Sequence, residues 1–190
     1  LNIDNGYILI ENGKITDLGS MNSCPPLPDK YIDLNHANTY PGFIDAHSHL
    51  GIFEDGLNFE GDDGNEMTDP ATPNLRVIDA INPFDKCFKE AIQHGVTTVA
   101  CSPGSSNPIA GQIAVIKTLG NRIDDMIVKA PAAIKFSLGE NPKTVYNDKN
   151  QTPITRMATA AIIREYLYKA KYYLKEKTKT ADILISAVGK

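Results

Sequence analysis

The sequence predicts an α/β protein with two regions, a short β region over residues 1–40 and a longer α/β region over residues 41–190. Two observations carry this prediction. Short apolar segments on either side of Asn12-Gly13 are typical of a β-hairpin. After Tyr40, strand-like apolar segments alternate with helix-like ones, and this alternation is characteristic of a parallel sheet.

The first region is expected to contain three strands. Residues 7–10 and 14–18 flank the Asn12-Gly13 turn, and residues 31–34 follow a rigid, proline-rich connection as a third strand. In the second region, we expect an apolar strand at 42–50 and a buried strand at 96–102, joined by a helix at 82–95. Asn82 is the expected N-cap of that helix, and Gly95 is expected to end it.

The next segment interrupts the alternation of strands and helices. Residues 111–118 and 122–130 alternate like a second β-hairpin, and residues 132–139 are predicted to form another buried strand. A long helix is expected over residues 155–175, because apolar residues recur there on one stripe.

Composition excludes several classes of function. The net charge of -4 gives no basic field for nucleic acid, and no apolar run is long enough to span a bilayer.

The three cysteines lack metal-type spacing, so we expect free thiols and a cytoplasmic protein. The chain opens at Leu1 without Met and ends in an apolar segment, which we interpret as a piece of a longer protein.

Two histidines lie one residue apart in the segment YPGFIDAHSHLG. In a strand, alternate side chains share a face, so Asp45, His47 and His49 are expected to point the same way. Two neutral imidazoles at this spacing can bind one divalent ion. The alternative is that both histidines have structural roles and bind no metal, and spacing alone leaves both interpretations open.

The segments ENGKI, YPGFIDAHSHLG, HGVTTV, GQIAVIKT and GENPK follow one another along the chain. In this order they resemble the metal-dependent amidohydrolase superfamily, in the branch around imidazolonepropionase. The resemblance implies the first strands of a (β/α) TIM-type barrel over residues 41–190, truncated, and part of a small β-sandwich over residues 1–40. A complete barrel needs eight strands and about 250 residues. This chain is shorter, and we expect three barrel strands in it, at 42–50, 96–102 and 132–139.

The resemblance also implies a function. His47 and His49 match the family's paired ligands for a divalent metal, here expected to be zinc, on the first barrel strand. Members hydrolyse amide or cyclic amide bonds of small molecules with metal-activated water. The family's later ligands would lie beyond residue 190, so we expect the isolated chain to be inactive and to associate with itself through open strand edges. A barrel relative that serves binding or assembly is the alternative.

Two residues compete as a further metal ligand, because family members use either a carboxylated lysine or a glutamate from a middle strand. Lys135 is expected at mid-strand, pointing into the barrel, whereas Glu140 is expected at the carboxyl end of the strand, where barrel active sites lie. Position therefore favours Glu140. If it binds no metal, Lys135 is expected to pair with an interior carboxylate. The corresponding alternative for Glu140 is a loop residue without a chemical role.

Other candidates are weaker. His94 is expected in the last helical turn, where a cation suits the helix dipole, and His36 is expected in a turn. The loop at 102–111 offers amides and hydroxyls to a substrate or is a plain connection. The acidic loop at 54–69 lacks the spacing of a calcium loop, so we expect it to be solvated.

Overall fold

A computed structural model describes residues 2–176 of the chain, and all statements about structure refer to these residues. The chain divides into two compact units, Leu1–Pro41 and Gly42–Lys190. The apolar segment that ends the chain lies outside the described residues.

The first unit is built on a β-hairpin. Strands β1 (Gly6–Glu11) and β2 (Lys14–Ser20) pair in antiparallel fashion, followed by the short 3-10 helix η1 (Met21–Ser23). Asn12 and Gly13 form the turn with φ angles of 52° and 73°, which explains the need for this residue pair. The two predicted strands are therefore confirmed.

The third strand predicted for the first unit is wrong. Residues 31–34 form no strand, and the chain turns directly after them. Asp33 Oδ1 accepts a hydrogen bond from Asn35 N at 2.8 Å, and both Asn35 and His36 have positive φ angles. An Asx turn at this point redirects the chain before a strand can pair with the hairpin.

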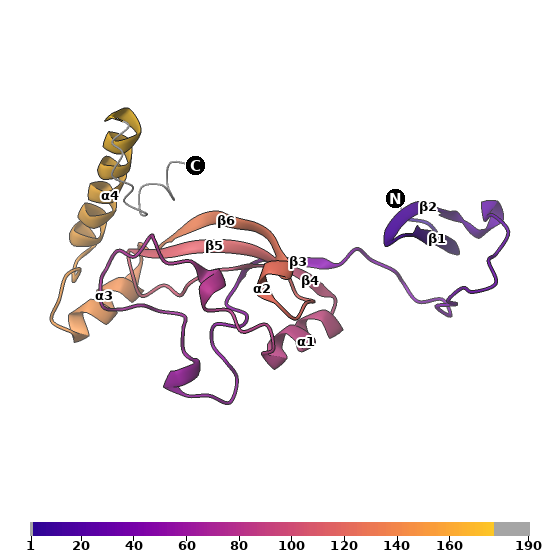
Figure 1. The fold of residues 1–190 in the computed structure, drawn as a ribbon, viewed down its shortest axis with the longest axis horizontal. Coiled ribbons are helices and arrows are strands. Elements are labelled where there is room, and N and C mark those ends of the chain that lie inside the picture. The colour runs from indigo at the N-terminus through magenta and orange to yellow at the C-terminus, as the bar shows by residue number, and fades with distance from the viewer. Residues whose placement is uncertain (1, 177–190) are drawn as a thin grey trace. The chain divides into compact units, whose positions relative to one another are not determined.

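The second unit contains a four-stranded sheet in the order β3-β4-β5-β6. Its strands are β3 (Phe43–Ser48), β4 (Val96–Cys101), β5 (Ile109–Lys117) and β6 (Ile127–Phe136). The pair β3 and β4 is parallel, whereas β5 is antiparallel to both β4 and β6. Figure 1 shows β5 and β6 as two long, curved strands that lie side by side.

One face of this sheet carries the hydrophobic core. Val99 and Cys101 of β4 are fully buried there with Ala114 and Ile116 of β5. Helix α1 (Lys86–Gln93) covers this face with Phe88. The long connection after β3 also covers this face, through Ile52, Ile81 and the 3-10 helix η3 (Val77–Asp79). A second 3-10 helix, η2 (Phe59–Gly61), lies in the same connection. Because side chains alternate along a strand, the neighbouring residues of β4 point to the opposite face.

Helix α1 is shorter than the sequence predicts. It begins at Lys86, and Asp85 is the N-cap, because its Oδ1 accepts a hydrogen bond from Cys87 N at 3.2 Å. Asn82, the predicted N-cap, instead accepts a hydrogen bond from Phe84 N in a separate turn. The predicted end is confirmed, since Gly95 follows the helix with a φ of 82°.

The second hairpin differs from the prediction in its second strand. Residues 123–126 form the short helix α2 (Ile123–Met126), and β6 then runs without interruption from Ile127 to Phe136. The segment expected as a separate barrel strand at 132–139 is thus the second half of β6, antiparallel to β5, and Phe136 is 38% exposed. The mixed α/β class is confirmed, whereas a partial TIM barrel remains a proposal.

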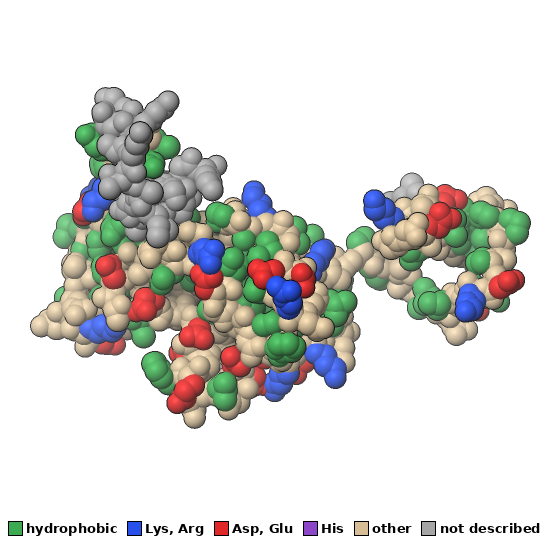
Figure 2. All heavy atoms as spheres, viewed as in Figure 1, with side chains coloured by type: hydrophobic (Ala, Val, Ile, Leu, Met, Phe, Trp, Pro, Cys, Tyr) green, Lys and Arg blue, Asp and Glu red, His purple; other side chains and the backbone are tan. Residues whose placement is uncertain are grey.

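Two helices follow the sheet, α3 (Glu140–Asp148) and α4 (Arg156–Glu176). The long helix predicted at 155–175 is confirmed, with the Thr155 hydroxyl accepting a hydrogen bond from Ala158 N at its start. Within residues 2–176, no helix is both long and apolar enough to cross a membrane. Figure 2 shows acidic, basic and hydrophobic side chains interspersed on the visible face of this unit.

Candidate metal centre

His47 and His49 lie at the carboxyl end of β3 with their rings close together. The ring centroids are 5.1 Å apart, and the planes are nearly perpendicular. His47 is exposed and His49 is half-buried, whereas Ser48 between them is buried. Ser48 is paired with Cys101 of β4, which faces the core. Both imidazoles therefore belong to the face of the sheet opposite the core, as the alternation of side chains predicts.

His49 is held by the residue that follows the neighbouring strand. Its Nδ1 lies 2.7 Å from the backbone carbonyl oxygen of Ser102, and Ser102 N in turn donates to Ser48 O at 2.9 Å. A carbonyl only accepts, so the His49 proton is on Nδ1 and the lone pair of a neutral ring is on Nε2. The same arrangement orients metal-binding histidines in proteins. The Phe53 ring packs edge-on against His49, with centroids 5.7 Å apart.

His47 contacts a lysine from the opposite edge of the sheet. Lys135 Nζ of β6 lies 3.1 Å from His47 Nε2. An ammonium group only donates hydrogen bonds, so Nε2 is the acceptor and the neutral ring carries its proton on Nδ1. The atom that accepts from Lys135 is thus also the atom with the lone pair that a metal ion would take.

Glu140 lies at the start of a helix. It is exposed and is the first residue of α3, after Gly139 at the N-cap position. No group of three or more His, Cys, Asp or Glu within residues 2–176 is placed to hold a metal ion. The assignment of Glu140 as a ligand remains a prediction, and Lys135 is the competing residue that the fold places at His47.

The sequence is similar to named proteins over most of its length. It is 30% identical to the amidohydrolase tasK of Hapsidospora irregularis, over 93% of this chain and 19% of that protein. It is also 30% identical to an imidazolonepropionase of Psychromonas ingrahamii, over 60% of this chain and 32% of that protein. A solved amidohydrolase from Thermotoga maritima MSB8 superposes with a TM-score of 0.80 and 38% identity, over 95% of this chain and 49% of that chain.

The chain belongs to the amidohydrolase superfamily. No protein-family model matches it. The chain spans between about a fifth and a half of the length of these three relatives.

The structure also contains a buried network that the sequence does not predict. Tyr146 of α3 is fully buried, and its hydroxyl donates to Asn107 Oδ1 at 2.7 Å. Asn107 Nδ2 in turn donates to Thr72 Oγ1 and to Glu66 O. Burial raises the pKa of Tyr146 to about 12. The network joins α3 to two loops, including the one that begins at Ser102.

One signal for this network was present in the sequence. The loop at 102–111 is rich in Ser, Gly and Pro, and a loop of that kind is a candidate for function, but nothing in the sequence indicates that Asn107 is buried. The partnership of Ser102 with His49 had no sequence signal, because a backbone carbonyl provides the contact. Ser102 is itself fully buried.

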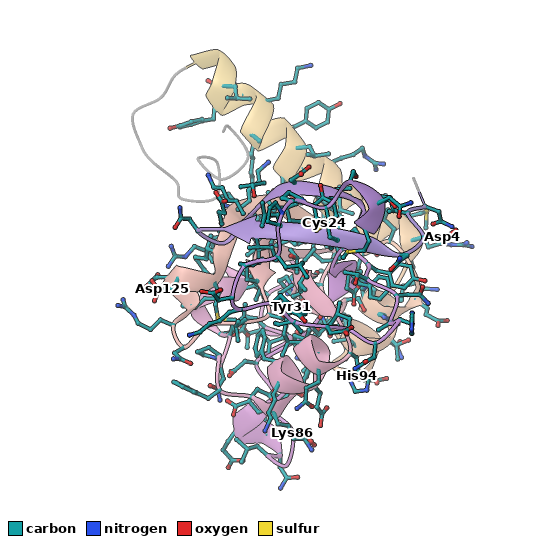
Figure 3. All side chains as sticks on the ribbon, turned by 90° about the vertical axis from the view of Figure 1, so that its right-hand side faces the viewer. Asp4, Cys24, Tyr31, Lys86, His94 and Asp125 are labelled. Atoms are coloured by element: carbon teal, nitrogen blue, oxygen red, sulfur yellow. The ribbon has the colours of Figure 1, made fainter. Side chains whose placement is uncertain are left out.

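The remaining candidates keep structural roles. His94 follows α1, where its Nδ1 lies 2.8 Å from Glu90 O, and Figure 3 shows it near the end of that helix, with Lys86 at the start. His36 is exposed in its turn. In the acidic loop, Asp55 forms an ion pair with Lys86, and Glu54 accepts a hydrogen bond from Asn82. These contacts connect the loop to the α1 region.

Proposed function

We propose that this chain carries the first metal ligands of a metal-dependent hydrolase that cleaves carbon–nitrogen bonds in amides or cyclic amides of a small molecule. The single observation that supports this proposal most is the His47–His49 pair on one strand face, with His49 oriented by Ser102 O. The similarity to amidohydrolases supports the reaction class.

The donor set fits a divalent ion such as zinc. His49 uses Nδ1 for its hydrogen bond to Ser102 O, which leaves the lone pair on Nε2 to bind an ion. The rings of His47 and His49 lie close together on one face of the sheet. Imidazole nitrogens are common zinc ligands. A bound divalent ion supplies Lewis acidity, which lowers the pKa of a bound water and polarises a carbonyl group. In this chain, His47 and His49 would hold the ion, and Ser102 would orient the His49 ring.

The further ligand is proposed from two candidates. Glu140 is the candidate by its position after the last strand. Lys135 has the stronger support from contacts, because its Nζ already lies against His47 Nε2. An uncharged lysine that reacts with carbon dioxide carries a carboxylate, so the side chain changes from a donor to an oxygen ligand. Lys135 would then cooperate with His47 instead of competing with the metal.

A partial barrel is proposed for the second unit. The contact between Lys135 on β6 and His47 on β3 joins the two outer strands of the sheet across β4 and β5. Neighbouring strands are about 4.8 Å apart, so the contact spans roughly 14 Å of backbone separation if the sheet is flat. A sheet that curves toward its histidine face shortens this separation, as the first strands of a barrel do.

The compartment and the assembly are also proposed. Cys24, Cys87 and Cys101 are free thiols, which favours a reducing compartment such as the cytoplasm. Exposed apolar residues at the β3 edge support self-association of the isolated chain.

Zinc binding tests the proposed function directly. Isothermal titration of the chain with zinc should show binding that both His47→Ala and His49→Ala remove. His94→Ala is the matched control, since His94 bonds within its own helix. Equal zinc binding in all variants would contradict the proposal.

A further inference from the structure

A buried hydroxyl without a partner among the described residues lies two positions along the chain from Lys135. Ser137 follows β6 directly and is 7% exposed, and its backbone N donates to Pro108 O at 3.1 Å. Its Oγ is buried and has no hydrogen-bond partner among the described residues. Buried polar groups are nearly always hydrogen-bonded, so an exception of this kind calls for an explanation.

The second buried side-chain atom of this kind within the described residues has a structural setting of its own. It is Asp85 Oδ2, on the carboxylate that caps α1 through its other oxygen. Ser137 makes no such capping contact. The position of Ser137 relative to Lys135 therefore indicates what its hydroxyl could bind.

Ser137 and Lys135 share one side of the extended chain. Alternate residues of a strand point the same way, and two steps of about 3.3 Å place their Cα atoms roughly 6.6 Å apart. Lys135 Nζ is at His47 Nε2, on the histidine face of the sheet. A hydroxyl donor thus lies on the same side of β6 as the amine, two residues nearer the end where the histidines lie.

We propose that Ser137 positions a carboxylated Lys135 by donating its hydroxyl hydrogen to one oxygen of the lysine carboxylate. In the modification, a bond forms between neutral Lys135 Nζ and the carbon of carbon dioxide. One C–O π pair moves onto oxygen, and the amine releases one proton to solvent. The inference rests on the proposed role of Lys135, and it adds the group that holds the modified side chain in place.

The physical basis is the strength of a hydrogen bond to a charged oxygen. An O–H···O⁻ bond is shorter and stronger than a bond between neutral groups. Reaction with carbon dioxide would provide the partner that Ser137 Oγ lacks. The same bond would direct the other carboxylate oxygen toward the ion at His47 and His49.

Carbon-13 NMR of the 190-residue chain with labelled bicarbonate and zinc tests this inference. The wild type should show a lysine carbamate signal that Lys135→Met abolishes. Ser137→Ala should lower the apparent affinity for carbon dioxide by about tenfold or more, as expected for loss of a hydrogen bond to a charged group. Ser137→Thr, which keeps a hydroxyl, should restore most of the signal, and Ser106→Ala is the matched serine control.

Each contrary result has a distinct meaning. A carbamate signal in Ser137→Ala as strong as in the wild type would overturn the inference, as would a Ser137→Thr variant that folds but shows no recovery. Thermal melting verifies folding of each variant. Absence of carbamate in the wild type would also overturn it, but zinc binding that depends on His47 and His49 would leave the proposed function standing.

Discussion

Lys135 Nζ lies 3.1 Å from His47 Nε2, although the two residues are 88 positions apart and occupy opposite edges of the sheet. The contact has a chemical consequence. The ammonium group occupies the imidazole lone pair, so Lys135 and a metal ion compete for His47 unless the lysine is neutralised or modified.

Metal binding by the isolated chain should therefore be weak. Two imidazoles form an incomplete site, since catalytic zinc usually has three protein ligands. We expect partial occupancy with zinc or manganese, measured by equilibrium dialysis and metal analysis, and none in the double variant His47→Ala, His49→Ala. Full occupancy at equimolar metal would contradict this expectation.

Two single variants distinguish the candidates for the further ligand. If Lys135 is the ligand, Lys135→Met should abolish the stimulation of zinc binding by bicarbonate, whereas Glu140→Gln should leave it unchanged. The reverse order, with binding insensitive to bicarbonate and weakened by Glu140→Gln, would establish Glu140 instead. Titration of both variants in the presence and absence of bicarbonate gives the answer.

Tyr146→Phe should destabilise the second unit. The change leaves Asn107 Oδ1 buried without its donor, and such a loss costs about 1–3 kcal/mol in the free energy of unfolding. Chemical denaturation monitored by circular dichroism measures the difference. Tyr172→Phe is the control, because Tyr172 is exposed, and a Tyr146→Phe variant as stable as this control would contradict the prediction.

The same tyrosine predicts a dependence of stability on pH. Burial raises the pKa of Tyr146 from 10.0 to about 12, so the unfolded chain loses this proton at lower pH than the folded chain. The contribution is fully present below pH 10 and is lost as pH rises toward 12. The free energy of unfolding should thus fall more steeply over this range in the wild type than in Tyr146→Phe. Parallel curves would contradict the assignment.

Self-association should depend on the outer edge of β3. In the described sheet, this strand is paired on one side only, and Phe43 and Ile44 are 61% and 72% exposed. Unpaired strand edges with apolar side chains promote pairing between chains. Light scattering should show dimers or larger species that Ile44→Lys reduces, whereas Leu119→Lys, at a residue 74% exposed in a loop, should have little effect. A wild-type chain that stays monomeric at high concentration would contradict this expectation.

We also expect no turnover by the isolated chain. It spans 49% of the solved amidohydrolase, and the proposed site has only His47, His49 and one further ligand to offer. A screen of amide and cyclic amide substrates with added zinc tests this. Hydrolysis that requires both the metal and His47 would show that the chain is sufficient for catalysis.

Local patterns determined much of the secondary structure. Asn12-Gly13 specified the first hairpin because its positive φ angles suit a tight turn, and Gly95 marked the end of α1 for the same reason. The spacing of His47 and His49 placed both rings on one strand face, since side chains alternate in any strand. These features depend only on residues close together in the chain.

Tertiary structure decided what depends on distant partners. The segment at 31–34 has strand composition but no neighbouring strand to pair with, and the segment at 132–139 is the second half of β6 because β5 provides its partner. The carbonyl of Ser102 beside His49, the amine of Lys135 beside His47 and the hydroxyl of Tyr146 beside Asn107 are all contacts between residues far apart in sequence. Sequence alone determined which side chains share the face of one strand, whereas the pairing of β3, β4, β5 and β6 decided which residues meet across the sheet.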